Sequence, residues 1–168
     1  MTLMKCVELG GGDRPKFRPN IDVRPGPKVD QVMDFNKPLD LLDNTYDLVY
    51  CEYVIEHVSW RNVKSFIKEI FRICAHGGTA LIITANLHEQ CKLVAESLEW
   101  QDNFSCMIFG DLDYSENSHK CGFSPVYVKK LFLEAGFSIV DVNPLPWCKT
   151  DMVINAKKDD ALKVKLNE

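Results

Sequence analysis

The sequence has no long hydrophobic run, no pair of cysteines at metal-binding spacing and no excess of basic residues. Because a membrane-spanning helix needs about 18 consecutive apolar residues, none is predicted. The first residues, MTLMKCVEL, enter a strand directly without the layout of a signal peptide, so we expect a cytoplasmic protein. The net charge of −4 argues against a general nucleic-acid binder.

The seven cysteines are odd in number and scattered, and no two of them form a CxxC pair. This pattern predicts reduced thiols that mostly pack in the core, and it predicts no metal site. The cysteines are Cys6, Cys51, Cys74, Cys91, Cys106, Cys121 and Cys148.

The sequence also lacks internal repeats and any segment with the composition of a linker. Its 168 residues, of which 46% are hydrophobic, suffice for one domain with a sizeable core. We therefore expect a single domain over residues 1–157. The charged residues 158–168 are predicted to form a tail that frays.

Short apolar runs alternate with helical patterns along the chain. Such alternation predicts an α/β fold with a mainly parallel, Rossmann-like sheet covered by helices. A last pair of strands supplies an antiparallel strand at the C-terminal end. The predicted strands are residues 5–9, 20–23, 29–33, 46–51, 79–85, 137–142 and 152–156.

The clearest helical pattern runs from Val63 to Cys74, where apolar residues recur at spacings of three and four. Gly77 and Gly78 follow this pattern and are predicted to end the helix.

The second half of the chain predicts two further helices separated by a long connection. One helix begins near His88, and the other has Ser124 as its N-cap and Pro125 at its first position. Residues 101–122 between them are turn-rich, and we expect an irregular loop. Loops of this length are often functional.

A glycine turn, Gly10–Gly12, follows the first strand, and Asp22 ends the second. Such a turn allows close approach of a ligand, and a carboxylate at the Asp22 position can accept hydrogen bonds from both hydroxyls of a ribose. A simple tight turn is the structural alternative.

The helix that normally follows such a turn is predicted to be shortened. Only residues 13–21 separate the turn from Asp22, and Pro15 and Pro19 interrupt them. A dinucleotide fits badly, because a helix N-terminus normally holds its pyrophosphate. A nucleoside without phosphate, such as S-adenosylmethionine, fits better.

Several segments in order resemble the class I S-adenosylmethionine-dependent methyltransferases, within the compact group described as methyltransferase type 11. The resemblance covers about Lys5 to Lys157, with His76 where the family usually has proline. The segments are VELGGG at 7–12, NID at 20–22, MDF at 33–35, NTYDLV at 44–49, VIEHV at 54–58 and ICAHGG at 73–78.

The resemblance implies S-adenosylmethionine as the cofactor and assigns residues to its parts. Asp22 is expected to bind the ribose and Asp34 the adenine amine. Glu8 or Asp13 is expected to meet the methionine ammonium, although Glu8 also fits a purely structural cap. The amides of Gly10, Gly11 and Gly12 are expected to meet the methionine carboxylate. Cys51, at the end of the fourth predicted strand, completes the cofactor-binding set.

Two histidines are candidates for a general base. His57 follows the fourth predicted strand at the carboxyl end of the sheet, where ligands bind in such folds. His119 lies in SHKCGFSP, which resembles a family stretch that lies over the active site. The alternatives are that His57 only orders its loop and that His119 is a surface residue. Asp113 and Tyr114, in the same loop as His119, are predicted to contact the substrate.

The predicted function is methyl transfer to a small polar acceptor, such as a sugar or natural-product hydroxyl. Two alternatives stay open. One is a non-catalytic module that binds S-adenosylmethionine and regulates a partner. The other is a methyltransferase acting on RNA or protein through a local basic edge, although the net acidity makes a nucleic-acid partner the weaker prediction. That edge would consist of Lys120, Lys129, Lys130 and Lys149.

Overall fold

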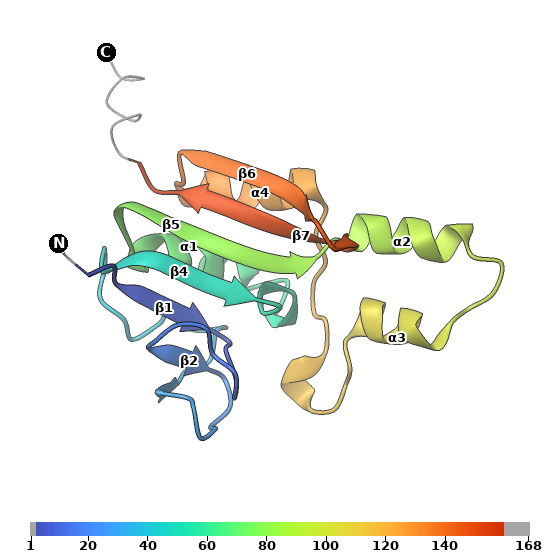
Figure 1. Ribbon diagram of the computed structural model, residues 1–168, viewed down its shortest axis with the longest axis horizontal. Coiled ribbons are helices and arrows are strands. Elements are labelled where there is room, and N and C mark those ends of the chain that lie inside the picture. The colour runs from blue at the N-terminus through green and yellow to red at the C-terminus, as the bar shows by residue number, and fades with distance from the viewer. Residues whose placement is uncertain (1–2, 160–168) are drawn as a thin grey trace, which may run out of the picture.

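The computed structural model describes residues 3–159, and its centre is one seven-stranded sheet in the order β3-β2-β1-β4-β5-β7-β6 (Figure 1). Neighbours from β3 to β5 are parallel, whereas β7 runs antiparallel to both β5 and β6. This sheet confirms the predicted fold class. The strands are β1 (Cys6–Leu9), β2 (Asn20–Asp22), β3 (Gln31–Val32), β4 (Tyr46–Glu52), β5 (Cys74–Ala85), β6 (Ile139–Leu145) and β7 (Cys148–Lys157).

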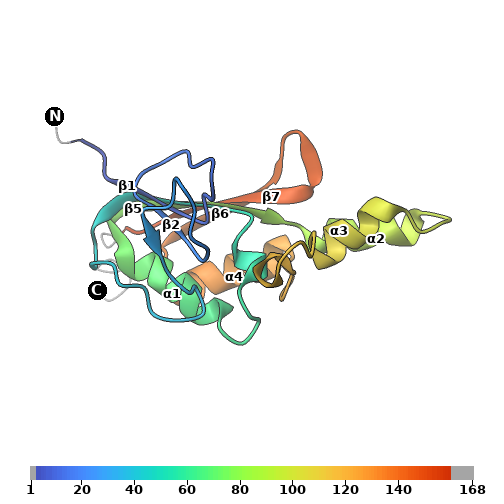
Figure 2. The same cartoon turned by 90° about the horizontal axis from the view of Figure 1, so that it is seen from below.

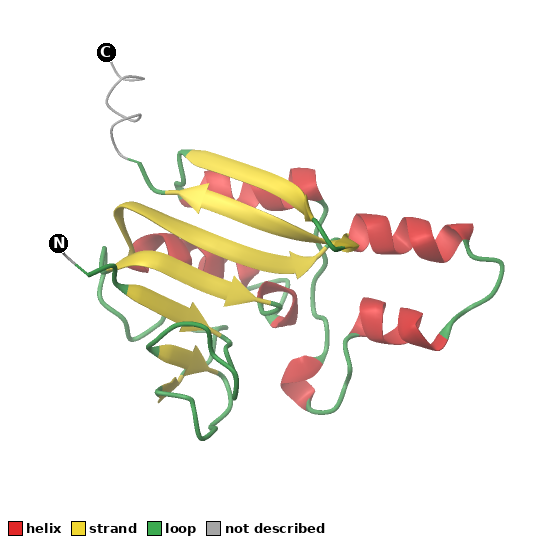
Figure 3. Ribbon diagram, viewed as in Figure 1, coloured by secondary structure: helices red, strands yellow, loops and turns green. Residues whose placement is uncertain are grey.

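Two helices, α1 and α4, lie on one face of the sheet, and α2 and α3 extend beyond its end (Figures 1 and 2). The first three strands are joined only by loops (Figure 3). The helices are α1 (Val63–Ile73), α2 (Leu87–Glu96), α3 (Asp102–Phe109) and α4 (Pro125–Ala135), with short 3-10 turns η1 (Ile55–His57) and η2 (Ser115–Asn117).

Helix α1 forms where its periodic apolar residues predicted, because Phe66, Ile67 and Ile70 are all buried in the main core. Its end was predicted wrongly. The helix stops at Ile73, since Cys74 already has an extended backbone and pairs with β4. Gly77 and Gly78 therefore lie within the first part of β5 rather than at a helix end.

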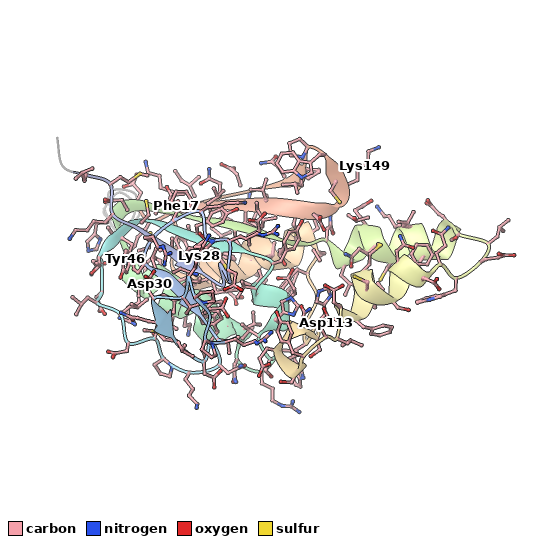
Figure 4. The ribbon with its side chains drawn as sticks, turned by 60° about the horizontal axis from the view of Figure 1, so that its bottom comes forward. Phe17, Lys28, Asp30, Tyr46, Asp113 and Lys149 are labelled. Carbon is pink, nitrogen blue, oxygen red and sulfur yellow. The ribbon has the colours of Figure 1, made fainter. Side chains whose placement is uncertain are left out.

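The loop between β1 and β2 replaces the usual first helix and is held by buried polar side chains. The Glu8 carboxylate accepts hydrogen bonds from the backbone amides of Lys16 and Phe17. Phe17, which is labelled in Figure 4, in turn packs against Tyr50 of β4, with ring centroids 5.3 Å apart. A folded loop thus occupies the place of the shortened helix.

Residues 101–122 are more regular than expected, because they contain α3 and η2. Phe104, Met107 and Ile108 have the i, i+3, i+4 spacing of a helix, and Phe104 is buried. The polar residues of 101–113 are exposed on an arm that projects from the sheet (Figure 3). Their polarity obscured the helical spacing in the sequence.

All seven cysteines are free thiols, and four of them lie in or against a core cluster, as expected for most of them. Cys51 and Cys74 are buried, Cys121 and Cys148 are partly buried against the clusters, and Cys91 and Cys106 are exposed. Both exposed thiols belong to the projecting arm, where little core exists to cover them.

The predicted tail does not fray at its first residue. Lys158 is buried, and its ammonium group donates hydrogen bonds to the Asn44 side chain and to the carbonyls of Phe71 and Cys74. The rest of the predicted tail, residues 160–168, lies outside the described residues.

Within residues 3–159, no helix is long and apolar enough to cross a membrane. The cytoplasmic location expected from the sequence stays a prediction.

Candidate functional site

A pocket lies at the carboxyl ends of the parallel strands, where α/β folds usually bind ligands. Its empty volume is about 570 Å³, including space open to solvent. Five parts of the chain contribute: the end of β1, the end of β2, the turn after β3, the η1 region and the segment before α4. The lining residues are Gly10, Asp22, Val23, Phe35, Asn36, Tyr53, Val54, His57, Val58, Tyr114, Glu116, Asn117 and Lys120.

Gly10 and Asp22 stand together in this pocket, as predicted from the sequence. Gly10 has a φ of +83°, and an added Cβ would lie 2.1 Å from a methyl carbon of Val54. Only glycine fits here, and the absent side chain leaves the backbone open to a ligand. The Asp22 carboxylate accepts one bond to each oxygen, from the amides of Gly12 and Arg24. Since a carboxylate has about four acceptor positions, two remain for ribose hydroxyls.

Gly11 and Gly12 do not line the pocket, and their amides are engaged within the chain. The Gly11 amide donates to the Asn20 side chain at 3.0 Å, and the Gly12 amide donates to Asp22 at 3.0 Å. The Gly10 amide donates to the Ile21 carbonyl. In this structure, the expected contact between these amides and a methionine carboxylate is therefore not available.

Two further cofactor candidates lie behind the pocket wall. Glu8 is buried, and both of its described bonds hold the loop after β1. Cys51 is fully buried in the main core, and burial raises the pKa of its thiol well above the ordinary range. The structure thus places Glu8 in its alternative role as a structural cap and gives Cys51 a packing role.

Asp34, which was expected to bind the adenine amine, does not line the pocket. It instead holds the turn that forms part of the pocket wall. Its carboxylate accepts the amide and side-chain N–H of Asn36, and the amide bond is the main cause of its lowered pKa. This turn presents Phe35 and Asn36 to the pocket.

His57 lines the pocket, and one of its ring nitrogens is already hydrogen-bonded within the chain. Its Nδ1 is 3.0 Å from the Ser118 carbonyl oxygen, which can only accept, so Nδ1 carries the proton. In the neutral ring, Nε2 is then an unprotonated acceptor. Burial is the main cause of a lowered His57 pKa, which favours this neutral form.

His119 packs against His57 instead of facing the pocket, with ring centroids 4.9 Å apart. Burial lowers the pKa of His119, and the nearby carbonyls of Ile108 and Met107 oppose this shift. The two candidate bases are therefore brought together, but only His57 lines the cavity.

Tyr114 and Asp113 are adjacent in the chain but differ in position. Tyr114 lines the pocket, and its ring stacks on the Arg24 guanidinium at 3.8 Å. Asp113 is exposed on the segment between α3 and α4, outside the lining residues (Figure 4).

Several pocket residues escaped the sequence analysis, above all Tyr53. It has a φ of +52°, a strained backbone for a bulky residue, and such residues cluster at functional sites. Its hydroxyl donates to Asp151 of β7 at 2.8 Å, and burial raises its pKa. Its position directly after β4 was the available signal. For Glu116, the signal was only its place in the long segment expected to be functional. Lys120 had been named from the sequence only as part of the basic edge, not as a pocket residue.

The four lysines of the predicted basic edge do not gather on one surface. Lys129 and Lys130 belong to α4, on the helix-covered face, and Lys130 pairs with Glu134. Lys149 lies on the β6–β7 hairpin, on the other side of the sheet (Figures 2 and 4). Within residues 3–159, no cluster of His, Cys, Asp and Glu is placed to hold a metal ion.

Comparison with known proteins identifies the same fold. A family profile described as "Methyltransferase domain" matches residues 4–142. A SAM-dependent methyltransferase from Thermotoga maritima is 18% identical, with a TM-score of 0.63 over 95% of this chain and 84% of that chain. An S-adenosylmethionine-dependent methyltransferase from Mesorhizobium loti is 13% identical, with a TM-score of 0.64 over 92% of this chain and 90% of that chain.

A protein from Pyrococcus horikoshii OT3 is 16% identical, with a TM-score of 0.66 over 92% of this chain and 82% of that chain. No curated protein matches the chain. At these identities the solved structures show a shared fold, whereas the profile covers most of the sequence. The family implies S-adenosylmethionine as cofactor, and Gly10 and Asp22 fit it. The chain therefore belongs to the methyltransferase-domain family of class I S-adenosylmethionine-dependent methyltransferases.

Proposed function

We propose that this methyltransferase acts on a hydroxyl of a small polar acceptor, such as a sugar or natural product, with His57 as general base. The observation that carries the proposal is the hydrogen bond between His57 Nδ1 and the Ser118 carbonyl. It leaves Nε2 of the neutral ring able to accept a proton. The lowered pKa of His57 keeps that nitrogen unprotonated near neutral pH.

We assign the cofactor to the wall made by Gly10, Asp22 and Phe35. Bound S-adenosylmethionine supplies a methyl group that its sulfonium already activates. The chain then has to align the acceptor, exclude water and remove the hydroxyl proton. In this assignment Asp22 holds the ribose and His57 Nε2 takes the proton.

The remaining walls favour a polar acceptor. Glu116, Asn117 and Lys120 bring a carboxylate, an amide and an ammonium group to one side of the pocket, and Tyr53 lies near the end of β4. Because the cofactor would take part of this pocket, the remaining space suits a small molecule. We take residues 1–157 as one methyltransferase domain.

The test is a turnover assay with methyl-labelled S-adenosylmethionine and matched panels of small alcohols, sugars and amines. We expect transfer to hydroxyl acceptors and its loss in His57→Gln, with S-adenosylhomocysteine binding unchanged. Transfer to amines alone would contradict the proposal that the acceptor is a hydroxyl. Unchanged turnover in His57→Gln would contradict the proposal that His57 is the general base. Cofactor binding without turnover on any acceptor would favour a regulatory module.

A further inference from the structure

A contact beside the pocket joins two segments that are distant in sequence. The guanidinium carbon of Arg24, in the loop after β2, lies 3.8 Å from the centre of the Tyr114 ring. Tyr114 immediately precedes η2, in the segment between α3 and α4. A cation over an aromatic face at this distance is attractive.

On one side, this contact is tied to the residue that we assign to the ribose. The amide of Arg24 donates to Asp22 Oδ1 at 3.0 Å, while Asp22 Oδ2 accepts the Gly12 amide. Asp22 and Val23 both line the pocket, so Arg24 continues directly from its wall. Arg24 is therefore linked through its backbone to the wall that carries Asp22.

On the other side, the contact is tied to the histidine that we assign as base. Residues 110–120 supply Tyr114, the Ser118 carbonyl that holds His57, and the Lys120 amide that donates to the Glu56 carbonyl. The same segment carries Glu116, whose pKa is lowered mainly by a hydrogen bond from Ser115, with Lys120 and Arg24 as further causes. Arg24 therefore lies over an aromatic ring and is close enough to the Glu116 carboxylate to contribute to lowering its pKa.

We propose that Arg24 and Tyr114 are positioning residues that latch segment 110–120 over the bound cofactor. The latch couples cofactor binding to the ordering of the segment that orients His57. Coupling of this kind is reciprocal: if the closed segment favours bound cofactor, bound cofactor favours the closed segment by the same factor. Only the catalytic consequence for His57 rests on the proposed function, because cofactor retention can be measured without an acceptor.

The test measures release of radiolabelled S-adenosylhomocysteine from the full chain by rapid filtration. We expect Arg24→Ala and Tyr114→Ala each to release it about two- to five-fold faster, the range of one exposed cation–π contact. Tyr114→Phe keeps the ring and should release at the wild-type rate. The double variant should be no faster than either single variant, because both remove the same contact.

The matched control is Arg61→Ala, which removes another exposed arginine, stacked on Trp60 at 4.3 Å, outside the residues that line the pocket. It should leave release unchanged. If Arg24→Ala releases S-adenosylhomocysteine no faster than Arg61→Ala, the proposed latch is wrong. It is also wrong if the rate increases of the two single variants multiply in the double variant.

Hydrogen exchange provides the second readout. S-adenosylhomocysteine should slow exchange of amides in 110–120 in the wild type and in Tyr114→Phe, and should do so less in Arg24→Ala. Equal protection in Arg24→Ala would overturn the coupling. If S-adenosylhomocysteine binds with these effects and no hydroxyl is methylated, the latch stands and the proposed acceptor fails.

Discussion

The imidazole rings of His57 and His119 meet edge to face, with centroids 4.9 Å apart and planes inclined by 61°. Only His57 lines the pocket, and its Nδ1 is held by the Ser118 carbonyl. The pair is therefore asymmetric: His57 lines the cavity and its neutral ring has an unprotonated Nε2, whereas His119 packs against it outside the lining residues. This asymmetry separates the two histidines experimentally.

Replacing His57 with glutamine should lower kcat/KM for methyl transfer by about 10²- to 10⁴-fold, the usual contribution of a general base. His119→Gln should lower it by less than about tenfold, because His119 only packs against the base. Steady-state kinetics would compare the variants, with S-adenosylhomocysteine affinity as the folding control. Equal losses would contradict the asymmetry.

The pH dependence of kcat/KM should show one acidic limb with an apparent pKa below the ordinary histidine value of 6.5, because burial lowers the pKa of His57. Activity should rise with pH through this limb, since the base has to be neutral to accept a proton. The limb should be missing from the residual activity of His57→Gln. Its persistence there would assign it to another group.

Asp22→Ala should weaken binding of S-adenosylhomocysteine by about 1–3 kcal/mol, because two hydrogen bonds to the ribose are lost. Asp22→Asn keeps one acceptor oxygen and should lose less. Asp40→Ala is the control, since Asp40 is an exposed carboxylate outside the pocket lining. Calorimetry gives all three affinities, and an unchanged affinity in Asp22→Ala would remove Asp22 from the cofactor site.

Glu8→Ala should lower the free energy of unfolding by about 2–3 kcal/mol, because the amides of Lys16 and Phe17 lose a charged acceptor in a buried position. Glu8→Gln retains an acceptor oxygen and should lose less. Lys16→Ala tests the exposed side of the same loop and should cost less than about 1 kcal/mol. Urea denaturation measures each value. If Glu8→Ala left the free energy of unfolding unchanged, the stability of the loop would not depend on this carboxylate.

The stability of the protein should fall as the pH rises from about 5 to 8, relative to Glu56→Gln. Burial raises the pKa of Glu56 from 4.5 to about 7 in the folded chain. At a pH below the pKa of the unfolded chain, the Glu56 carboxyl is protonated in both the folded and the unfolded state. At a pH above the pKa of the folded chain, the folded core has to hold a charged carboxylate, which destabilises it. The difference should be on the order of 3 kcal/mol at most, measured by denaturation at both pH values. If the stability of the wild type and of Glu56→Gln changed with pH in parallel, the raised pKa of Glu56 would be wrong.

Much of the fold follows from local patterns. The buried runs of β4 and β5 and the apolar stripe of α1 were predictable because each is determined by its own residues. The end of α1 was not, since pairing between Tyr46 and Cys74 overrode the glycine signal. Helix α3 was missed because it is short and exposed, so its few apolar positions stood among polar ones.

The site divides in the same way. Gly10, Asp22 and His57 could be predicted because each follows a strand at its carboxyl end, a position that sequence order defines. Tyr53 could have been chosen on that criterion but has no distinctive chemistry in the sequence. Lys120 could not, because its place in the pocket depends on how residues 110–120 fold back over η1.

By itself the sequence determined the order of the strands and of helices α1, α2 and α4, the glycine turn without a full helix, and the acids and histidines available for chemistry. Local spacing suffices for these, since hydrophobic period and backbone restriction act over a few residues. Only the tertiary structure decided which of these groups are available to a ligand. Glu8, Gly11 and Gly12 make hydrogen bonds that hold the loop after β1, and the ring of Tyr114 lies against Arg24. Such choices depend on contacts between segments far apart in the chain, which local patterns do not encode.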